Sequence, residues 1–339
     1  SREIIFTKYH NNTEIIDEEK TGISISNNIE LIDSKLIIMP GFIATDSNNE
    51  ISNLGRGGSD YTASIMANYT NSEALEIWTD VSGVFSANPK IVKNSKAIES
   101  LSYKEAMELS FFGAKVIYFP TLQPLIEKSI PAYIKNTFDK DAIGTCISNK
   151  AGNNGETTIK GISHIEKISL INFEGSGMVG VPGFSKRFFG ALSEKGINVI
   201  MITQASSEFS ICIAVKESDA NNAKISIDKE FEYEISQKKI NECQIESSLS
   251  NIAIVGDNMK SKKGVSGKLF STLGNNNINI RAIAQGASER NISIIIDEKD
   301  NTKALNSLHE AFFENNCKNL HLFITGVGNV GSNLIRQIS

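Results

Sequence analysis

The sequence predicts an α/β protein in two parts, a layered and mainly parallel sheet followed by two small ferredoxin-like βαββαβ units. Strand-like and helix-like segments alternate between residues 35 and 136, which favours parallel strands layered with helices. Further along, the chain repeats itself: ITQASSE at 202–208 aligns with IAQGASE at 283–289, an offset of 81 residues. Between the parts, the stretch 149–158 (NKAGNNGETT) is rich in Asn and Gly, which is typical of a linker.

The composition is ordinary for a globular protein and points to no macromolecular partner. A length of 339 residues suits two or three domains, and a net charge of −5 without a basic stripe argues against nucleic acid. The four cysteines form no CxxC pair and only four histidines occur, so we expect reduced thiols and no metal site. No apolar run reaches the length of a membrane span, so we predict a cytoplasmic protein without a membrane partner.

Local patterns give the elements of the first part in chain order. The apolar run from Leu36 to Met39 predicts a buried strand that enters a glycine turn. A helix should follow, with Ser59 or Asp60 as its cap. The predicted elements after the first strand are a helix at 59–69, a strand at 75–78, an amphipathic helix at 103–112 and a strand at 131–136.

Each copy of the repeat predicts a strand, a helix, two strands and a second helix. In the first copy, Val181, Phe184, Phe188 and Leu192 are spaced three, four and four residues apart, which places them on one helix face. The β-branched segments INVIMITQ and INIRAIAQ predict the strands that follow each first helix. This order is that of a ferredoxin-like unit with one sheet face covered by helices.

Two motifs of the first part follow predicted strands and carry polar residues. In LGRGGSDYTA (54–63), glycines allow close approach to a ligand and Arg56 offers a planar fork for a carboxylate or phosphate. The alternative is a tight turn with a surface arginine. In TDVSGVFSANPK (79–90), a polar pair ends a strand, where α/β sheets hold nucleotides, although a simple β-turn loop fits the same residues. A third segment, FFGAKV (111–116), places Lys115 where it could meet a phosphate or remain solvated.

The order and spacing of these motifs resemble the aspartate kinase branch of the amino acid kinase family across nearly the whole chain. The resemblance implies that residues 1–148 are the C-terminal part of an amino acid kinase fold, a three-layer αβα arrangement with a mainly parallel sheet, and that 149–160 form a linker. The implied reaction transfers the γ-phosphoryl group of ATP to the side-chain carboxylate of L-aspartate, with Mg-ATP as co-substrate.

The same resemblance assigns the nucleotide side of this site. Thr79 and Asp80 would contact ATP, Phe85 would flank its base, and Lys90 and Lys115 would be cations near its phosphates. The family has Tyr at position 85 and Arg at position 90. Phe85 keeps the stacking surface, whereas Lys90 loses the bidentate fork of arginine.

On the substrate side, Arg56 would hold the α-carboxylate of L-aspartate, with Ser59 and Asp60 in the same pocket. The family's Lys-Phe-Gly-Gly segment, which carries its central lysine, does not occur in the sequence, so no catalytic residue is assigned. We read Ser1 as a cut end and expect the chain alone to be inactive. The alternative interpretation is therefore a threonine-binding regulatory module without chemistry of its own.

The repeat resembles a tandem pair of ACT domains, at 161–246 and 247–319. ITQASSE and IAQGASE are similar to the variants in bifunctional enzymes that respond to threonine, so Gln204 and Gln285 would contact L-threonine. The turns 175–177 and 256–258 precede helix starts, where N–H groups favour a carboxylate. The alternative makes both glutamines ordinary polar residues at strand ends. ACT domains would also assemble a homo-oligomer, a dimer or a tetramer.

Residues 320–339 predict a strand, a glycine-rich turn with Gly326, Gly328 and Gly331, and a helix. This GxGxxG context resembles the start of a homoserine dehydrogenase Rossmann domain, which would bind NADP(H) in a bifunctional aspartate kinase–homoserine dehydrogenase. The alternative is an extra strand and helix packed on the preceding units. The unit reads as unfinished at Ser339.

Overall fold

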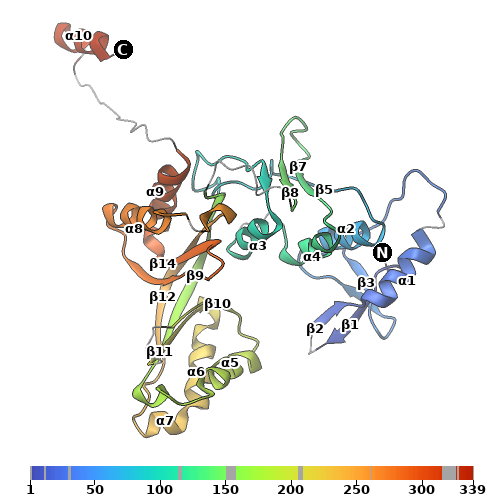
Figure 1. The fold of residues 1–339 in the computed structure, drawn as a ribbon, viewed down its shortest axis with the longest axis horizontal. Helices are drawn as coiled ribbons and strands as arrows, with labels where there is room; N and C mark the ends of the chain where they lie inside the picture. Colours follow the sequence, from blue (N-terminus) through green and yellow to red (C-terminus); the bar gives the residue numbers. More distant parts are fainter. Residues whose placement is uncertain are drawn as a thin grey trace.

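The computed structural model describes residues 2–10, 13–29, 32–113, 117–149, 158–204, 209–260, 262–314, 326 and 328–338. Two bodies of sheet and helix make up this part of the chain, and the first lies beside the upper end of the second (Figure 1). No helix in the described ranges is long and apolar enough to cross a membrane.

The first part is built on a four-stranded sheet in the order β5-β7-β8-β6. Its elements are β5 (Leu75–Thr79), β6 (Ser100–Leu101), α3 (Tyr103–Phe111), α4 (Phe119–Lys128), β7 (Ala132–Asn136) and β8 (Thr145–Ile147). The β5–β7 and β6–β8 pairs are parallel, whereas β7–β8 is antiparallel. A shared apolar cluster, with Leu101, Leu122 and Ile134 fully buried, joins the sheet to its helices. The strand at 75–78, the helix at 103–112 and the strand at 131–136 are thereby confirmed within a residue or two.

Smaller elements precede this sheet. They are β1 (Thr7–His10), β2 (Thr13–Ile16), α1 (Glu18–Ile29), β3 (Ile43–Thr45), β4 (Ile51–Asn53) and α2 (Gly58–Tyr69). The helix predicted at 59–69 is confirmed as α2, but its N-cap is Gly57, with φ of 68°, and no side chain caps it. The conformation of Gly57 is left-handed, which glycine adopts without steric strain.

The buried strand predicted at 36–39 is wrong. These residues form no strand, and Leu36 and Ile38 are 73% and 87% exposed. The short strand β3 begins only at Ile43 and pairs with β4. An apolar run becomes a strand when a neighbouring strand accepts its backbone hydrogen bonds, and no described strand pairs with 36–39.

The second part is one six-stranded sheet in the order β10-β11-β9-β12-β14-β13. Its first repeat unit holds α5 (Phe184–Glu194), β10 (Val199–Thr203), β11 (Ser210–Lys216), α6 (Ala220–Glu230) and α7 (Glu232–Ser236). Its second repeat unit holds α8 (Val265–Asn275), β13 (Ile280–Ala284), β14 (Asn291–Asp297) and α9 (Asn301–Phe313). The starts of α5, β10 and β11 lie 81 residues before those of α8, β13 and β14, so the internal repeat is confirmed. Val181 precedes α5 and is exposed, so it does not belong to the apolar helix face.

Two long central strands are shared between the repeat units. Strand β9 (Gly161–Glu174) pairs with β11 through residues 168–174, and its first residues, from Gly161 to Ile165, pair with residues 251–255 of β12 (Gln244–Val255). Strand β12 also pairs with β14 through residues 249–255. The second unit therefore receives its last strand from the segment that opens the first unit. The two repeat units, predicted at 161–246 and 247–319, are thus interlocked through β9 and β12.

Helix α3 joins the two parts. The Ser163 hydroxyl on β9 donates to the carbonyl oxygens of Leu109 and Phe112 at the end of α3. At the start of α3, Ser102 and Glu105 form a capping box, and Glu105 also accepts from the Asp257 N–H of the second unit at 2.8 Å. The first part is thus fixed to the second repeat unit at both ends of α3.

Helix α10 (Asn329–Ile338) stands apart from both bodies in Figure 1. Its apolar side chains Val330, Leu334 and Ile335 are exposed. The strand predicted just before the glycine turn lies outside the described residues.

Candidate functional site

The polar loop after β5 begins where two parallel strands end side by side. Thr79 Oγ1 lies 3.1 Å from Asp80 Oδ1, and the Thr79 carbonyl accepts from the N–H of Thr137 at 2.8 Å. Because β5 and β7 are parallel, Asn136 of β7 reaches the same edge, and its amide donates to Ser82 Oγ at 2.9 Å. Asp80 is exposed at this edge, so its carboxylate is accessible to a ligand.

A glycine turn then draws the loop against β8. Gly83 has φ of 115°, and a Cβ there would collide with Thr145 Oγ1. The same hydroxyl accepts from the Val84 N–H at 2.8 Å. This turn places Phe85, which is half-buried and forms an isolated bridge with Ala97. Thr79, Asp80 and Phe85 therefore belong to one tightly held loop.

The two predicted cations differ in what the structure shows. Lys90 is exposed just beyond a turn in which Asn88 Oδ1 accepts from the Lys90 N–H at 3.1 Å. Its ammonium forms no ion pair with any described residue. Lys115 lies outside the described residues.

The glycine loop before α2 carries the predicted substrate residues. Gly55 and Gly57 both have positive φ, and a Cβ on Gly57 would lie 2.5 Å from Tyr118 Cβ, so glycine is required there. Arg56 and Ser59 are exposed. Asp60, in the first turn of α2, is half-buried, and this burial raises the pKa of its carboxyl.

The substrate loop and the nucleotide loop remain separate in the structure. Among the described residues, no hydrogen bond or ion pair joins Arg56, Ser59 or Asp60 to the loop of Thr79 and Asp80. A site shared by these loops stays a prediction.

In the first repeat unit, Gln204 lines a hollow of about 480 Å³ at the start of α5. The other lining residues belong mainly to the turn 180–185, and none of those described carries a charge. The turn 175–177, predicted to face a ligand, packs elsewhere: the Gly177 N–H donates to the Lys239 carbonyl at 2.9 Å, and a Cβ on Gly175 would collide with Ile240. The hollow is therefore lined by residues 180–185 and not by the predicted turn 175–177.

The equivalent turn of the second unit is occupied by the first part of the chain. Asp257 Oδ1 accepts from Arg290 Nε at 2.8 Å, and Asp257 Oδ2 accepts from the Ser102 hydroxyl. Gln285 is exposed at the end of β13. The equivalent turn is thus packed in both copies, against Lys239 and Ile240 in the first and against the start of α3 in the second.

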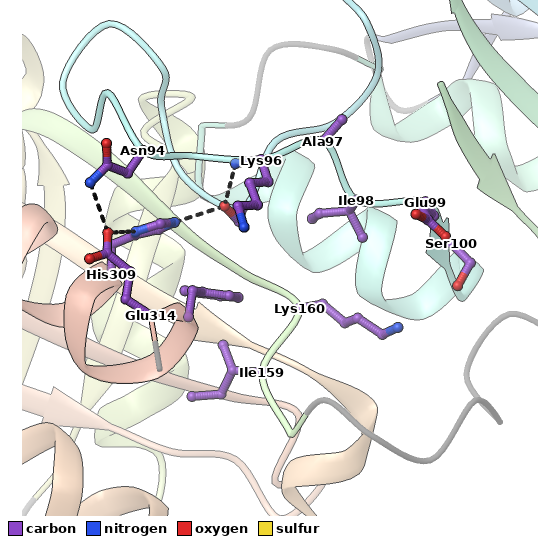
Figure 2. A pocket seen from close by; sticks show the side chains of 12 residues that line it. Asn94, Lys96, Ala97, Ile98, Glu99, Ser100, Ile159, Lys160, His309 and Glu314 are labelled. Atoms are coloured by element: carbon purple, nitrogen blue, oxygen red, sulfur yellow. Dashed lines mark hydrogen bonds and ion pairs between the residues drawn. The ribbon is translucent and has the colours of Figure 1, made fainter. Parts of the chain in front are cut away.

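Sequence reasoning missed the junction between the first part and α9. A cavity of about 720 Å³ lies there, lined by residues of the segment 94–100, by Ile159 and Lys160, and by the end of α9 (Figure 2). His309 of α9 forms part of its wall and is 2% exposed. A single histidine within an amphipathic helix pattern carries no local signal for such a role.

The glycines of the C-terminal motif lie at the start of α10. Gly326 has φ of 94°, and a Cβ on Gly326 or Gly328 would meet nothing within 4 Å. Gly331 lies in the first turn of α10. An NADP(H) site at these glycines stays a prediction.

Family models match both parts of the chain. The amino acid kinase family model matches residues 9–136, and the ACT domain model matches residues 171–231 and 252–312. The bifunctional aspartokinase/homoserine dehydrogenase of Haemophilus influenzae is 40% identical over 323 residues, which is 95% of this chain. The chain spans 39% of the length of that relative.

Solved structures resemble the chain over most of its length. The aspartate kinase of Clostridium acetobutylicum superposes with a TM-score of 0.77 at 30% identity, over 91% of this chain and 69% of that one. Aspartokinase III of Escherichia coli in complex with aspartate and ADP (R-state) gives 0.78 at 26% identity, over 92% and 69%. Its complex with lysine and aspartate (T-state) gives 0.71 at 27% identity, over 92% and 68%.

Proposed function

The chain belongs to the aspartate kinase family, and we propose that it carries the nucleotide side and the amino-acid sensor of an enzyme that phosphorylates the side-chain carboxylate of L-aspartate. One observation carries this proposal: the loop of Thr79, Asp80 and Phe85 is held by Gly83 and Thr145 at the carboxyl end of two parallel strands. Such edges of α/β sheets are where ligands bind.

Each residue of the loop has a chemical task in this proposal. Phe85 stacks against the base, Thr79 and Asp80 contact the nucleotide, and Lys90, whose ammonium has no ion pair among the described residues, neutralises phosphate charge. Lys115 would add a second cation. Phosphoryl transfer depends mainly on positioning and charge neutralisation, so these residues serve Mg-ATP rather than covalent chemistry.

The substrate side of the proposal rests on the glycine loop. Its backbone leaves Arg56 exposed, and a guanidinium can hold the α-carboxylate of L-aspartate with two hydrogen bonds. Ser59 and Asp60 lie in the adjacent first turn of α2. Arg56→Lys would keep the charge and lose the fork, so weaker aspartate binding in this variant, measured by calorimetry, tests the assignment.

We propose L-threonine as the effector, bound in the hollow beside Gln204. The start of α5 supplies N–H groups for a carboxylate, and the amide of Gln204 can bond the hydroxyl or the ammonium. No described lining residue carries the negative charge that a lysine side chain would require. The exposed Gln285 is the second candidate contact.

Calorimetric titration with threonine, and with lysine and methionine as controls, tests the effector. Saturable heat with threonine alone, abolished by Gln204→Ala, supports the assignment. Saturable heat with lysine alone would instead place the protein in a lysine-regulated class.

The exposed isoleucines on the two edge strands of the six-stranded sheet favour assembly through the ACT domains as a dimer or tetramer. Ile202 on β10 and Ile283 on β13 occupy equivalent positions and are both exposed. Ile202→Lys combined with Ile283→Lys should reduce the mass measured by sedimentation equilibrium. An unchanged mass would exclude these edge strands as the assembly interface.

The parent protein is proposed to be a bifunctional aspartate kinase–homoserine dehydrogenase. In that protein, Gly326, Gly328 and Gly331 would approach the pyrophosphate of NADP(H), because glycines leave room for it beside a helix start. Binding of NADPH to the parent, lost on Gly328→Val, tests this assignment.

A second candidate function is a threonine sensor without phosphoryl transfer. It is favoured by the hollow beside Gln204, which could bind an effector without any catalytic residue. Formation of aspartyl phosphate by this chain, trapped with hydroxylamine, would exclude it.

A further inference from the structure

The segment that follows Phe85 is embedded in the second repeat unit. Ala87 and Val92 are buried in the same apolar cluster as Ile162, Leu305 and Leu308 of β9 and α9. The carbonyl of Ser86 accepts from the Ile162 N–H at 2.7 Å. The loop proposed to hold the nucleotide therefore continues directly into the core of the sensor.

A chain of polar contacts then joins this segment to α9. The Lys96 N–H donates to Ser86 Oγ at 3.1 Å, and Ser86 Oγ lies 2.9 Å from His309 Nε2. On the other side of the ring, His309 Nδ1 lies 3.6 Å from Glu314 Oε1, which also accepts from the Asn94 amide at 3.1 Å. Figure 2 shows His309 between Glu314 and the loop segment that carries Lys96.

The imidazole is fixed in one orientation. It is buried and stacks on Phe313 with the ring centroids 4.9 Å apart. Burial lowers the pKa of His309, which keeps the ring neutral near pH 7. Ser86 Oγ accepts from Lys96 and can donate its own proton to Nε2. In that tautomer the ring proton lies on Nδ1, which is 3.6 Å from Glu314 Oε1 and has no hydrogen-bond partner among the described residues.

We propose that His309 is a positioning residue for the nucleotide: through Ser86 it sets the place of Phe85, and so couples nucleotide binding to the position of α9. This inference rests on the proposed function, because it needs a nucleotide beside Phe85. It adds a physical route by which the sensor acts. A shift of α9 breaks the hydrogen bond between His309 and Ser86 and lets the loop around Phe85 relax. The protein therefore binds the nucleotide with different affinity in the two positions of α9.

The first experiment measures hydrogen exchange in the ligand-free chain. The reporters are the Ser86 and Ile98 N–H groups, which donate to the Lys96 and Val84 carbonyls at 2.8 Å across the loop. In His309→Leu we expect both to exchange about fivefold faster, the equivalent of one hydrogen bond of about 1 kcal/mol. Amides of β5 should be unchanged.

Three further variants make this result specific. His309→Gln retains a polar group that can bond Ser86 and should restore slow exchange. Ser86→Ala removes the partner with little change of volume and should reproduce His309→Leu. Glu310→Gln, at an exposed position of α9, is the matched control and should match the wild type.

The second experiment titrates MgADP and follows the fluorescence of Trp78, which directly precedes Thr79. His309→Leu and Ser86→Ala should raise the Kd about fivefold, with rescue by His309→Gln. Unchanged exchange and unchanged Kd in both variants would overturn the inference. Absence of MgADP binding to the wild type would overturn the proposed function, while the exchange result would still decide whether His309 holds the loop.

Discussion

Substitution of Glu105 is the strongest test of how the two parts of the chain are joined. Glu105 is 1% exposed, and its two oxygens accept from different parts: Oε2 from the Ser102 N–H at 2.9 Å and Oε1 from the Asp257 N–H at 2.8 Å. Glu105→Ala leaves two N–H groups without partners at a buried interface. Hydrogen bonds to charged groups contribute about 1.5–3 kcal/mol each, so we expect a loss of about 3–6 kcal/mol for the two.

The assay uses the single tryptophan of the chain as a local probe. Trp78 lies on β5 of the first part, so its fluorescence during urea unfolding reports on that part, whereas far-UV circular dichroism reports on the whole chain. In Glu105→Ala the Trp78 transition should move to lower urea and separate from the transition followed by dichroism. Glu105→Gln keeps one acceptor oxygen and should lose about half as much stability.

The matched control is Glu73→Ala, which removes an exposed glutamate of the same part. Its effect should stay within about 0.5 kcal/mol of the wild type. The reasoning is refuted when Glu105→Ala is as stable as Glu73→Ala, because the two N–H groups would then find other partners at no cost.

Three further predictions concern other regions of the molecule. Gln204→Ala should weaken threonine binding at least about tenfold, the equivalent of about 1.4 kcal/mol, and equal affinity in calorimetry would remove Gln204 from the site. His309 has a pKa below its ordinary value of 6.5, so below about pH 6.5 the unfolded chain binds more protons than the folded chain. The free energy of unfolding should therefore fall as the pH drops from about 6.5 through the folded pKa. Urea midpoints of the wild type and His309→Gln should diverge below about pH 6.5 and run parallel above it. Gly57→Ala should destabilise the first part by about 1–3 kcal/mol, because alanine is strained at a φ of 68° and its Cβ would press on Tyr118; a Trp78 unfolding midpoint equal to that of the wild type would contradict this.

Local sequence patterns predicted the helices and strands whose apolar spacing repeats within a few residues. Apolar spacing predicted α2, β5, α3 and β7, because a helix or strand needs one face that suits burial. The offset of 81 residues predicted that both repeat units have the same elements, and the structure places α5 and α8 at that offset. The glycine-rich loop before α2 was also visible in the sequence, since glycine adopts a positive φ without steric strain.

Sequence patterns failed where the structure of a segment depends on pairing with a distant strand. The run at 36–39 has strand composition, but no described strand lies beside it, so its backbone gains nothing from an extended form. Equally, nothing in the local sequence shows that β9 lends its first residues to the second unit. That pairing, Gly161 with Val255, joins residues distant in sequence.

The sequence by itself determined the family resemblance, the repeat and the residues proposed to contact the nucleotide, because these are carried by short motifs and fixed spacings. Only the tertiary structure decided that Gln204 lines a hollow with residues 180–185, that the second copy holds α3, and that Ser86 meets His309 across 223 positions of sequence. The physical reason is that a hydrogen bond between distant segments depends on how whole units pack, and packing leaves no periodic signal in either segment.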